Sequence, residues 1–258
     1  MLHRKNSFRV ASVLEKSLLC LFALAGAEAC SHEGGAPPAS SPSGAASTDG
    51  SPAASASQEN LGQGGASLFV VHMMSDFDAF KKYFEEGAAE REKAGIKGYL
   101  LSRLDDGTVV IHLFADDLEK VQNALNSPDL ERYLDRKGAP ETSLVWLTKN
   151  AVVKVPAAPP TGQTYSLYLK LHVGDFAALE RGFEARHAVF AEQGVVGEGL
   201  HRSTDRENIA ILHFMGTAKD KLEALPKRPE FVELLKQAKV DGEVKPLIGV
   251  DLARNRPK

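Results

Sequence analysis

The sequence contains one stretch twice. Residues 76–114 read DFDAFKKYFEEGAAEREKAGIKGYLLSRLDDGTVVIHLF, and residues 175–214 read DFAALERGFEARHAVFAEQGVVGEGLHRSTDRENIAILHF. At a constant offset the second stretch repeats the residues Asp76, Phe77, Ala79, Phe84, Glu85, Ala89, Gly95, Gly98, Leu101, Arg103 and Asp106. One inserted residue in the following turn then aligns Phe114 with Phe214. Such self-similarity predicts two copies of one folding unit.

The formal net charge of −3 is unevenly distributed. Residues 1–29 carry more basic than acidic side chains, whereas residues 30–66 carry acidic side chains only, so the remaining chain is close to neutral. A nearly neutral domain lacks the basic surface that nucleic acid needs, and we expect no nucleic-acid partner. Cys20 and Cys30 both precede residue 31, so the folded part has neither a disulfide nor a thiol nucleophile.

The N-terminus, residues 1–29, has the pattern of an export signal. Lys5, Arg9 and Lys16 precede or open an apolar run, SLLCLFALAG, which is too short to span a bilayer, because a spanning helix needs about 20 residues. The run ends at Ala27-Glu28-Ala29-Cys30. This arrangement resembles a bacterial lipoprotein signal, in which the cysteine is lipidated and becomes the mature N-terminus. The alternative is ordinary cleavage after Ala29, which leaves Cys30 free.

Residues 30–66 are rich in Ala, Ser, Gly and Pro and show no apolar periodicity. Such a segment cannot bury enough surface to offset its ordering entropy, so we expect a disordered tether with a mean span of about 30–35 Å. A lipidated Cys30 would then tether a soluble domain to a membrane. By resemblance to proteobacterial lipoproteins, Ser31 implies the outer membrane, since it is not an acidic retention signal. A secreted or periplasmic protein is the alternative.

Apolar patterns predict the order β-α-β-β-α-β in each copy. In the first copy, residues 67–155, we expect strands at 68–74, 99–104, 109–114 and 144–147, and helices at 76–95 and from 118, with a restart at Ser127-Pro128. In the second, residues 164–258, we expect strands at 165–173, 198–203, 209–214 and 245–252, and helices at 175–193, 219–225 and 229–238. Residues 156–163 form a proline-rich linker. This order predicts two α+β, ferredoxin-like units.

The first copy resembles a known family. His72-Met-Met-Ser-Asp-Phe-Asp-Ala-Phe80, Ala94-Gly-Ile-Lys-Gly-Tyr99, Arg103 and Ser127-Pro-Asp-Leu130 are similar to the antibiotic-biosynthesis-monooxygenase-like branch of the dimeric α/β barrel superfamily. The resemblance implies two sheets packed face to face around a cavity, here as an intramolecular pseudo-dimer. An antiparallel sheet with helices on one face also needs a cover for its other face. The superfamily includes cofactor-free oxygenases, haem-binding enzymes and isomerases, and fold does not choose among them.

The first strand of the second copy has a polar row. Ser166, Tyr168, Lys170 and His172 alternate with leucines and therefore share one face. If the leucines lie under the helices, the row lines the cavity, where Lys170 and His172 could hold an anionic or phenolic ligand and His172 could act as a base. The alternative is a row that is merely solvated. The first copy has Phe69, Val71 and Met73 at the matching positions, so any site would be asymmetric.

Histidine and arginine residues on the predicted strands are the other candidates. His72 and His112 fall on adjacent strands and could bind a metal or haem, but no carboxylate lies nearby in sequence, so buried histidines are the alternative, as they are for His201 and His213. His187 is expected to pack within a helix, and Trp146 to line a pocket or the core. Arg103 and Arg202 end matching strands, where they could pair with Asp105 and Asp205 or steer acidic ligands at the cavity mouth.

Three functions follow from these patterns. The leading one is a tethered, monomeric lipoprotein that binds a small, mainly apolar ligand, without a cofactor or metal. The second is a cofactor-free monooxygenase or isomerase for a phenolic or quinone-like substrate, with Tyr168, Lys170 and His172 as its polar groups. The third is a structural barrel with a filled interior. A pocket of about 300 Å³ or more would favour binding or catalysis.

Overall fold

The computed structural model describes residues 58–60, 65–73, 77–126, 144–156, 158 and 160–255. Several predictions lie outside this part of the chain, namely the export signal with Cys30, most of the tether, the helix start at Asp76 and the helix restart at Ser127-Pro128. Within the described part, no helix has the length and apolar character that a membrane span requires.

The described chain alternates strands and helices in the predicted order. Its first half contains β2 (Ala66–Met73), α2 (Phe77–Glu86), α3 (Ala88–Lys93), β3 (Ile96–Leu104), β4 (Thr108–Ala115), α4 (Leu118–Leu125) and β5 (Leu144–Pro156). Its second half contains β6 (Tyr165–Val173), α6 (Phe176–Ala185), α7 (His187–Glu192), β7 (Val195–Ser203), β8 (Ile209–Gly216), α8 (Lys219–Ala224), the 3₁₀ turn η2 (Leu225–Lys227), α9 (Pro229–Gln237), β9 (Val240–Asp241) and β10 (Pro246–Asn255). A short β1 (Gln58–Asn60) precedes both halves.

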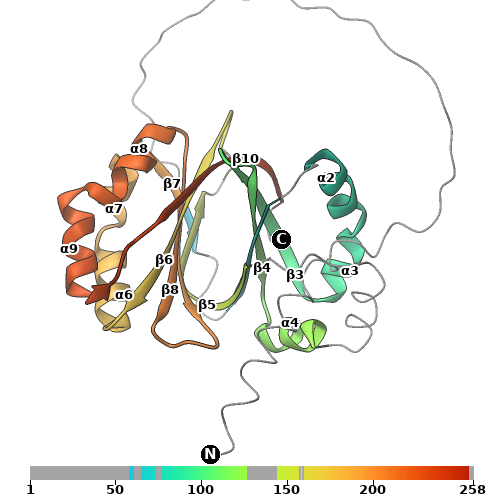
Figure 1. Cartoon of the computed structure of the whole chain (residues 1–258), viewed down its shortest axis with the longest axis horizontal. Coiled ribbons are helices and arrows are strands. Elements are labelled where there is room, and N and C mark those ends of the chain that lie inside the picture. Colours follow the sequence, from blue (N-terminus) through green and yellow to red (C-terminus); the bar gives the residue numbers. More distant parts are fainter. Residues whose placement is uncertain are drawn as a thin grey trace, which may run out of the picture.

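All strands belong to one antiparallel sheet. The strands pair in the order β1-β5-β2-β4-β3-β10-β6-β8-β7, and β5 also pairs with β7, so the sheet closes on itself. The order within each half, β5-β2-β4-β3 and β10-β6-β8-β7, is that of a ferredoxin-like unit. Figure 1 shows the helices on the two outer sides of the strands, α2 to α4 on one side and α6 to α9 on the other.

Each group of helices covers one apolar core. In the second half, Leu167, Leu169 and Leu171 of β6 pack with Leu179 and Phe183 of α6, as strand alternation predicts. The corresponding core of the first half contains Leu68, Val70, Phe84, Leu101, Ile111, Leu113, Val121 and Leu125. Burial of these side chains under the helices leaves the opposite face of every strand for the interior of the closed sheet.

Each of the two long helices predicted at 76–95 and 175–193 is divided in the structure. The second begins as expected, because the Asp175 carboxylate accepts a hydrogen bond from the Ala178 amide at 2.9 Å. It is interrupted at Arg186, whose guanidinium donates to the carbonyl of Gly182 in α6 and to the carbonyl of Glu230 in α9. The first is interrupted at Gly87. In the sequence the apolar stripe of each predicted helix reads as continuous across these breaks.

Two strand predictions differ from the structure. β5 was expected to end at 147 but continues to Pro156, since its later residues pair with β7 and with β1. β1 lies within the predicted tether. It pairs with the last residues of β5, whose backbone groups would otherwise form an open sheet edge.

The alignment of the two hairpins also needs a correction. Gly98 pairs with Phe114 and the matching Gly197 pairs with Met215, so Phe114 corresponds to Met215 and not to Phe214. The second hairpin therefore has two inserted residues.

Candidate functional site

The middle of the closed sheet is filled by apolar side chains. The cluster contains Phe69, Leu104, Val110, Tyr168, Ile209 and Ile211, with Val71, Trp146 and Leu247 packed at its edge. Its members come from both halves of the chain. We call this cluster the central plug.

The residues of the polar row on β6 differ in burial according to their position along the strand. Tyr168 belongs to the central plug, and its hydroxyl contacts the Ser102 hydroxyl at 2.9 Å. Burial raises the pKa of the Tyr168 phenol, which stays neutral at pH 7. Lys170 is half-buried with its ammonium 5.4 Å from the centre of the Trp146 ring, and His172 is exposed. Tyr168 is therefore enclosed, whereas Lys170 and His172 approach solvent.

The matching row on β2 follows the same gradient. Phe69 is fully buried and stacks on His112 with ring centroids 4.1 Å apart. Val71 is half-buried, and Met73 is 68% exposed. Of these three residues, only Phe69 lies well inside the closed sheet.

Neither arginine candidate belongs to the interior cluster. The Arg202 guanidinium lies 4.7 Å from the ring centre of Phe176, which packs against the helix-side core, and it donates to the Glu207 carbonyl. Arg103 is exposed. The carboxylate partner that we expected for Arg202 was Asp205, but the described contact of Arg202 is with Glu207.

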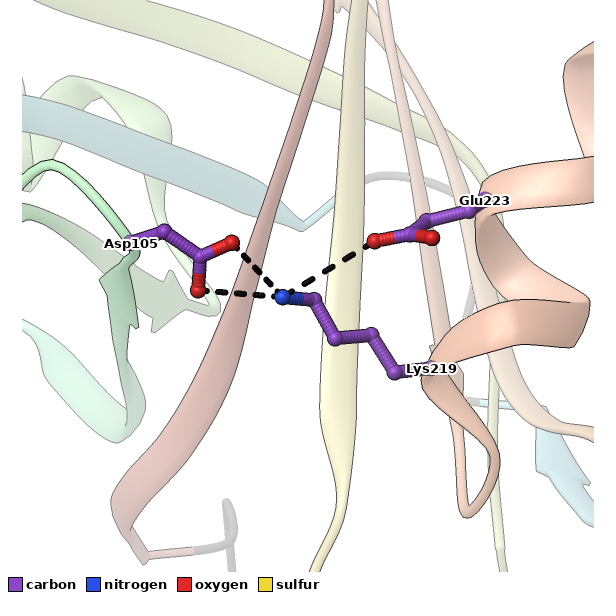
Figure 2. Close-up of polar contacts among 3 residues, drawn as sticks. All are labelled: Asp105, Lys219 and Glu223. Atoms are coloured by element: carbon purple, nitrogen blue, oxygen red, sulfur yellow. Dashed lines mark hydrogen bonds and ion pairs between the residues drawn. The ribbon is translucent and has the colours of Figure 1, made fainter.

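Asp105, the expected partner of Arg103, instead contacts a lysine of the other half. Lys219 of α8 lies 2.7 Å and 3.0 Å from the two carboxylate oxygens of Asp105, and 3.8 Å from Glu223 (Figure 2). The ammonium thus joins the β3–β4 turn to the first turn of α8. This contact ties the two halves at their surface.

The histidines form a different group from the one expected. His72 shares the face of Leu68 and Val70, which lies toward the helices, so it does not meet His112 inside the sheet. His112 of β4 instead lies next to His201 of β7 and His213 of β8, with ring centroids 5.3 Å and 5.0 Å away. Strands of both halves bring these three residues together.

These three histidines line a pocket at one end of the closed sheet. The pocket has a volume of about 50 Å³, well below the 300 Å³ that we took as the mark of a ligand site. Its remaining interior lining is mainly apolar and includes Leu100, Phe114, Val153, Val155, Gly197, Gly199 and Met215. Its rim includes the half-buried Pro160 and the exposed Asn255. Space of this size accepts about four water molecules at ~10–15 Å³ each.

A chain of hydrogen bonds defines the tautomers of two of the histidines. The Ser67 hydroxyl donates to Asn150 Oδ1 at 2.9 Å, so its oxygen accepts from His112 Nε2 at 3.1 Å. His201 Nδ1 lies 2.8 Å from the same Asn150 oxygen, which can only accept. His112 therefore carries its proton on Nε2 and His201 on Nδ1.

The second nitrogen of each of these rings is a buried acceptor. Burial lowers the pKa of His112 and His201 well below the ordinary value, and the neighbouring His213 lowers both further, so both are neutral at pH 7. A neutral imidazole has one N–H and one lone pair. Within the described part of the chain, His112 Nδ1 and His201 Nε2 have no hydrogen-bond partner.

Two buried carboxyl groups lie near the pocket or the central plug. Glu198 has a fully buried side chain and contacts His187 Nδ1 of α7 at 2.9 Å, with Lys154 at 3.9 Å. Asp251 accepts from the Ser102 hydroxyl at 2.7 Å. Burial raises the pKa of both carboxyl groups. Among the described residues, no group of three or more His, Cys, Asp or Glu side chains is arranged to hold a metal ion.

A second depression, of about 280 Å³, lies where residues 162–164 meet the end of β10. It is lined by Gly162, Gln163, Thr164, Asp251, Leu252, Ala253 and Arg254. Its lining is formed by one short connecting segment and one strand, whereas the histidine pocket is formed by strands of both halves. The histidine pocket is therefore the stronger candidate for a site of function.

Comparison with known proteins shows the fold. No protein family matches the sequence, and no curated protein is similar to it. An anthrone oxidase-like protein of known structure has a TM-score of 0.56 at 12% identity, over 77% of this chain and 96% of that one. A proposed monooxygenase from Fusobacterium nucleatum has a TM-score of 0.53 at 12% identity, over 75% and 94%. Another from Lactobacillus acidophilus has a TM-score of 0.51 at 12% identity, over 74% and 94%.

At this level of identity the likeness concerns the fold alone. The chain has a mixed α/β, ferredoxin-like fold with an antiparallel sheet, which confirms the ferredoxin-like part of the fold class predicted from the sequence. The reaction of those proteins is not transferred by the comparison.

Proposed function

We propose that this protein is a membrane-tethered, extracytoplasmic protein that binds a small, mainly apolar ligand in the histidine pocket. The observation that carries the proposal is the pair of unpartnered acceptors, His112 Nδ1 and His201 Nε2, on residues that line an otherwise apolar pocket. A buried polar group without a partner costs about 1–3 kcal/mol. A core selected only for stability would replace both imidazoles by apolar side chains, whereas a ligand with a donor hydrogen would satisfy them.

The closed sheet supports an intramolecular pseudo-dimer. Ser67 and Ser166 occupy matching positions of the repeat, and each hydroxyl lies 3.1 Å from Nε2 of a histidine, His112 in one half and His213 in the other. Those histidines also match, because His112 pairs with Phe69 and His213 pairs with Tyr168. The same Ser–His contact thus occurs once in each half. We infer that the two halves are copies of one unit, closed around a shared interior.

The ligand of this pocket is small. Room for about four water molecules encloses a short chain or one edge of a single ring whose remainder lies at the rim. The enzymatic alternative loses its expected polar groups. Tyr168 is a buried, neutral phenol. Lys170 and His172 pair with Ile211 and Ile209, so the central plug separates them from the histidine pocket, which Met215 and His213 line. Binding without these groups is the function that the geometry favours.

Membrane attachment rests on the sequence. The predicted signal, residues 1–29, ends just before Cys30, and residues 30–66 have the composition of a flexible tether. A tether would keep the ligand-binding domain accessible while it stays attached to a membrane, by resemblance the outer membrane. The protein would then collect or deliver its ligand at the cell envelope as a monomer.

Native mass spectrometry of the purified full chain tests the proposal. We expect a small bound mass that dissociates on denaturation, or saturable binding of one-ring alcohols and phenols. His201→Phe removes one acceptor while keeping an aromatic ring, and it should weaken this binding, whereas His172→Gln at the exposed position should not. A chain that carries no ligand and binds none of these compounds would support the filled structural barrel instead.

A further inference from the structure

We propose that Gly199 determines the specificity of the histidine pocket, and that the ligand donates a hydrogen bond to His201 Nε2 across this glycine. The inference rests on the proposed function, which it deepens by naming the chemistry of the ligand: a small apolar molecule with a neutral hydroxyl or N–H group. The argument begins from a difference between the two halves.

Gly199 and Leu100 occupy matching positions. Gly199 pairs with His213 on β8, and Leu100 pairs with His112 on β4. Both residues line the pocket, and Leu100 is 4% exposed. The first half thus fills its side of the pocket with an isobutyl group, whereas in the second half the imidazole of His201 occupies the space beside residue 199. The two sides of the pocket therefore differ.

The backbone does not require glycine at this position. The positive φ angles of described glycines occur at Gly95, Gly107, Gly162, Gly194 and Gly242, and Gly199 is not among them. The reason is the space that His201 occupies: a Cβ atom on residue 199 would lie 2.4 Å from His201 Nε2 and 3.1 Å from its Cε1. Any side chain here would displace the ring, whose Nδ1 is held by Asn150.

The chemistry of the ligand follows from the groups that lack partners. His201 Nε2 and His112 Nδ1 are both acceptors, since the other nitrogen of each ring carries the proton. At the rim, the Arg254 guanidinium already donates to Thr164 Oγ1 at 3.3 Å and to the Pro160 carbonyl at 2.6 Å. A ligand carbonyl or ether oxygen would face lone pairs, whereas a hydroxyl or N–H would satisfy one of them.

Phenol and its methyl ether, anisole, are the matched probes. Both have one ring, but only phenol has a donor hydrogen. With the full-length protein we expect isothermal titration to show saturable binding of phenol, and binding of anisole that is at least about tenfold weaker, since an unpartnered buried acceptor carries a penalty of that order. Phenol should also shift the ¹⁵N resonance of His201 Nε2, because the lone pair becomes hydrogen-bonded.

Two variants distinguish the size of the pocket from its preference for a ligand that donates a hydrogen bond. Gly199→Ala should remove the preference for phenol over anisole, because the new methyl group displaces the His201 ring. Leu100→Ala, at the matching position, should keep this preference and also admit the larger 4-methylphenol. If Gly199→Ala does not fold, His201→Phe carries the test, and it should bind the two probes with similar affinity.

Each outcome decides one of the two proposals. If the wild-type protein binds neither probe nor any other small ligand, the proposed function fails. Equal binding of phenol and anisole by the wild type, with the ¹⁵N resonance of His201 unshifted, leaves ligand binding in place and overturns the role of His201. A folded Gly199→Ala variant with an unchanged preference overturns the role of Gly199.

Discussion

Acidification should destabilise this protein through its three interior histidines. His112, His201 and His213 are at most 7% exposed. Burial lowers the pKa of His213 to about 3, and it lowers the pKa of His112 and His201 well below the ordinary value of 6.5. The unfolded chain therefore takes up protons below pH 6.5 that the folded chain does not. Stability is fully present above pH 6.5 and falls as the pH decreases below it.

The size of the effect follows from the proton uptake. Protonation of His213 in the unfolded chain lowers the free energy of unfolding by about 2 kcal/mol between pH 7.5 and pH 5, because one unit of pH below the unfolded pKa corresponds to about 1.4 kcal/mol. His112 and His201 add to this loss in the same direction. A typical domain has a free energy of unfolding of about 5–15 kcal/mol, so the loss from His213 alone is measurable.

The assay is urea denaturation followed by circular dichroism at pH 7.5, 6.5, 5.5 and 5.0. Burial raises the pKa of the Glu198 and Asp251 carboxyl groups, which therefore change stability in the opposite sense. Comparison with His213→Gln cancels their contribution, since both proteins retain these groups. We expect this variant to lose about 2 kcal/mol less than the wild type between pH 7.5 and pH 5. The control His172→Gln, at an exposed position, should follow the wild type.

The reasoning would be refuted by parallel pH profiles of the wild type and His213→Gln. Parallel profiles would mean that His213 titrates alike in the folded and unfolded states. The imidazole would then be hydrated or paired with a carboxylate, and the apolar surroundings of the histidine pocket would not exist as described.

Three further predictions concern the tautomers, the anchor and the closure of the sheet. Long-range ¹H–¹⁵N spectra at pH 7.5 should show the Nε2–H form of His112 and the Nδ1–H form of His201, and the opposite assignment would contradict the hydrogen-bond chain through Ser67 and Asn150. Cys30→Ser should move the full chain from membranes to the soluble fraction, whereas a wild-type protein that is already soluble and carries no acyl mass would exclude the lipid anchor. Residues 67–155 alone should form a homodimer or aggregate, because half of the closed sheet exposes an apolar face, and a stable folded monomer of this fragment would contradict the pseudo-dimer.

The order of elements was determined by the sequence itself. Strand alternation placed Leu167, Leu169 and Leu171 beneath the helices, and β6 has the bounds that its pattern predicts. This works because period two along a strand depends only on local backbone geometry. The same local reasoning missed the helix breaks at Gly87 and Arg186, since the apolar stripe continues through both.

Tertiary structure decided how deeply each residue of a strand lies within the closed sheet. Alternation placed Tyr168, Lys170 and His172 on one face, but it could not say that Tyr168 would be enclosed while His172 would meet solvent. Exposure along a strand depends on which other strands cover each end, and that information is not contained in the strand.

The candidate site was decided in the same way. His112, His201 and His213 belong to β4, β7 and β8, and the pairing of β5 with β7 brings Asn150 to His201. This long-range pairing orients the imidazole of His201 and leaves its Nε2 as a free acceptor, whereas the imidazole of His112 is oriented by Ser67 of its own half. The sequence alone therefore determined which faces of the strands are interior, whereas the closure of the sheet decided which interior residues meet, because a hydrogen bond between strands of different halves has no local signature.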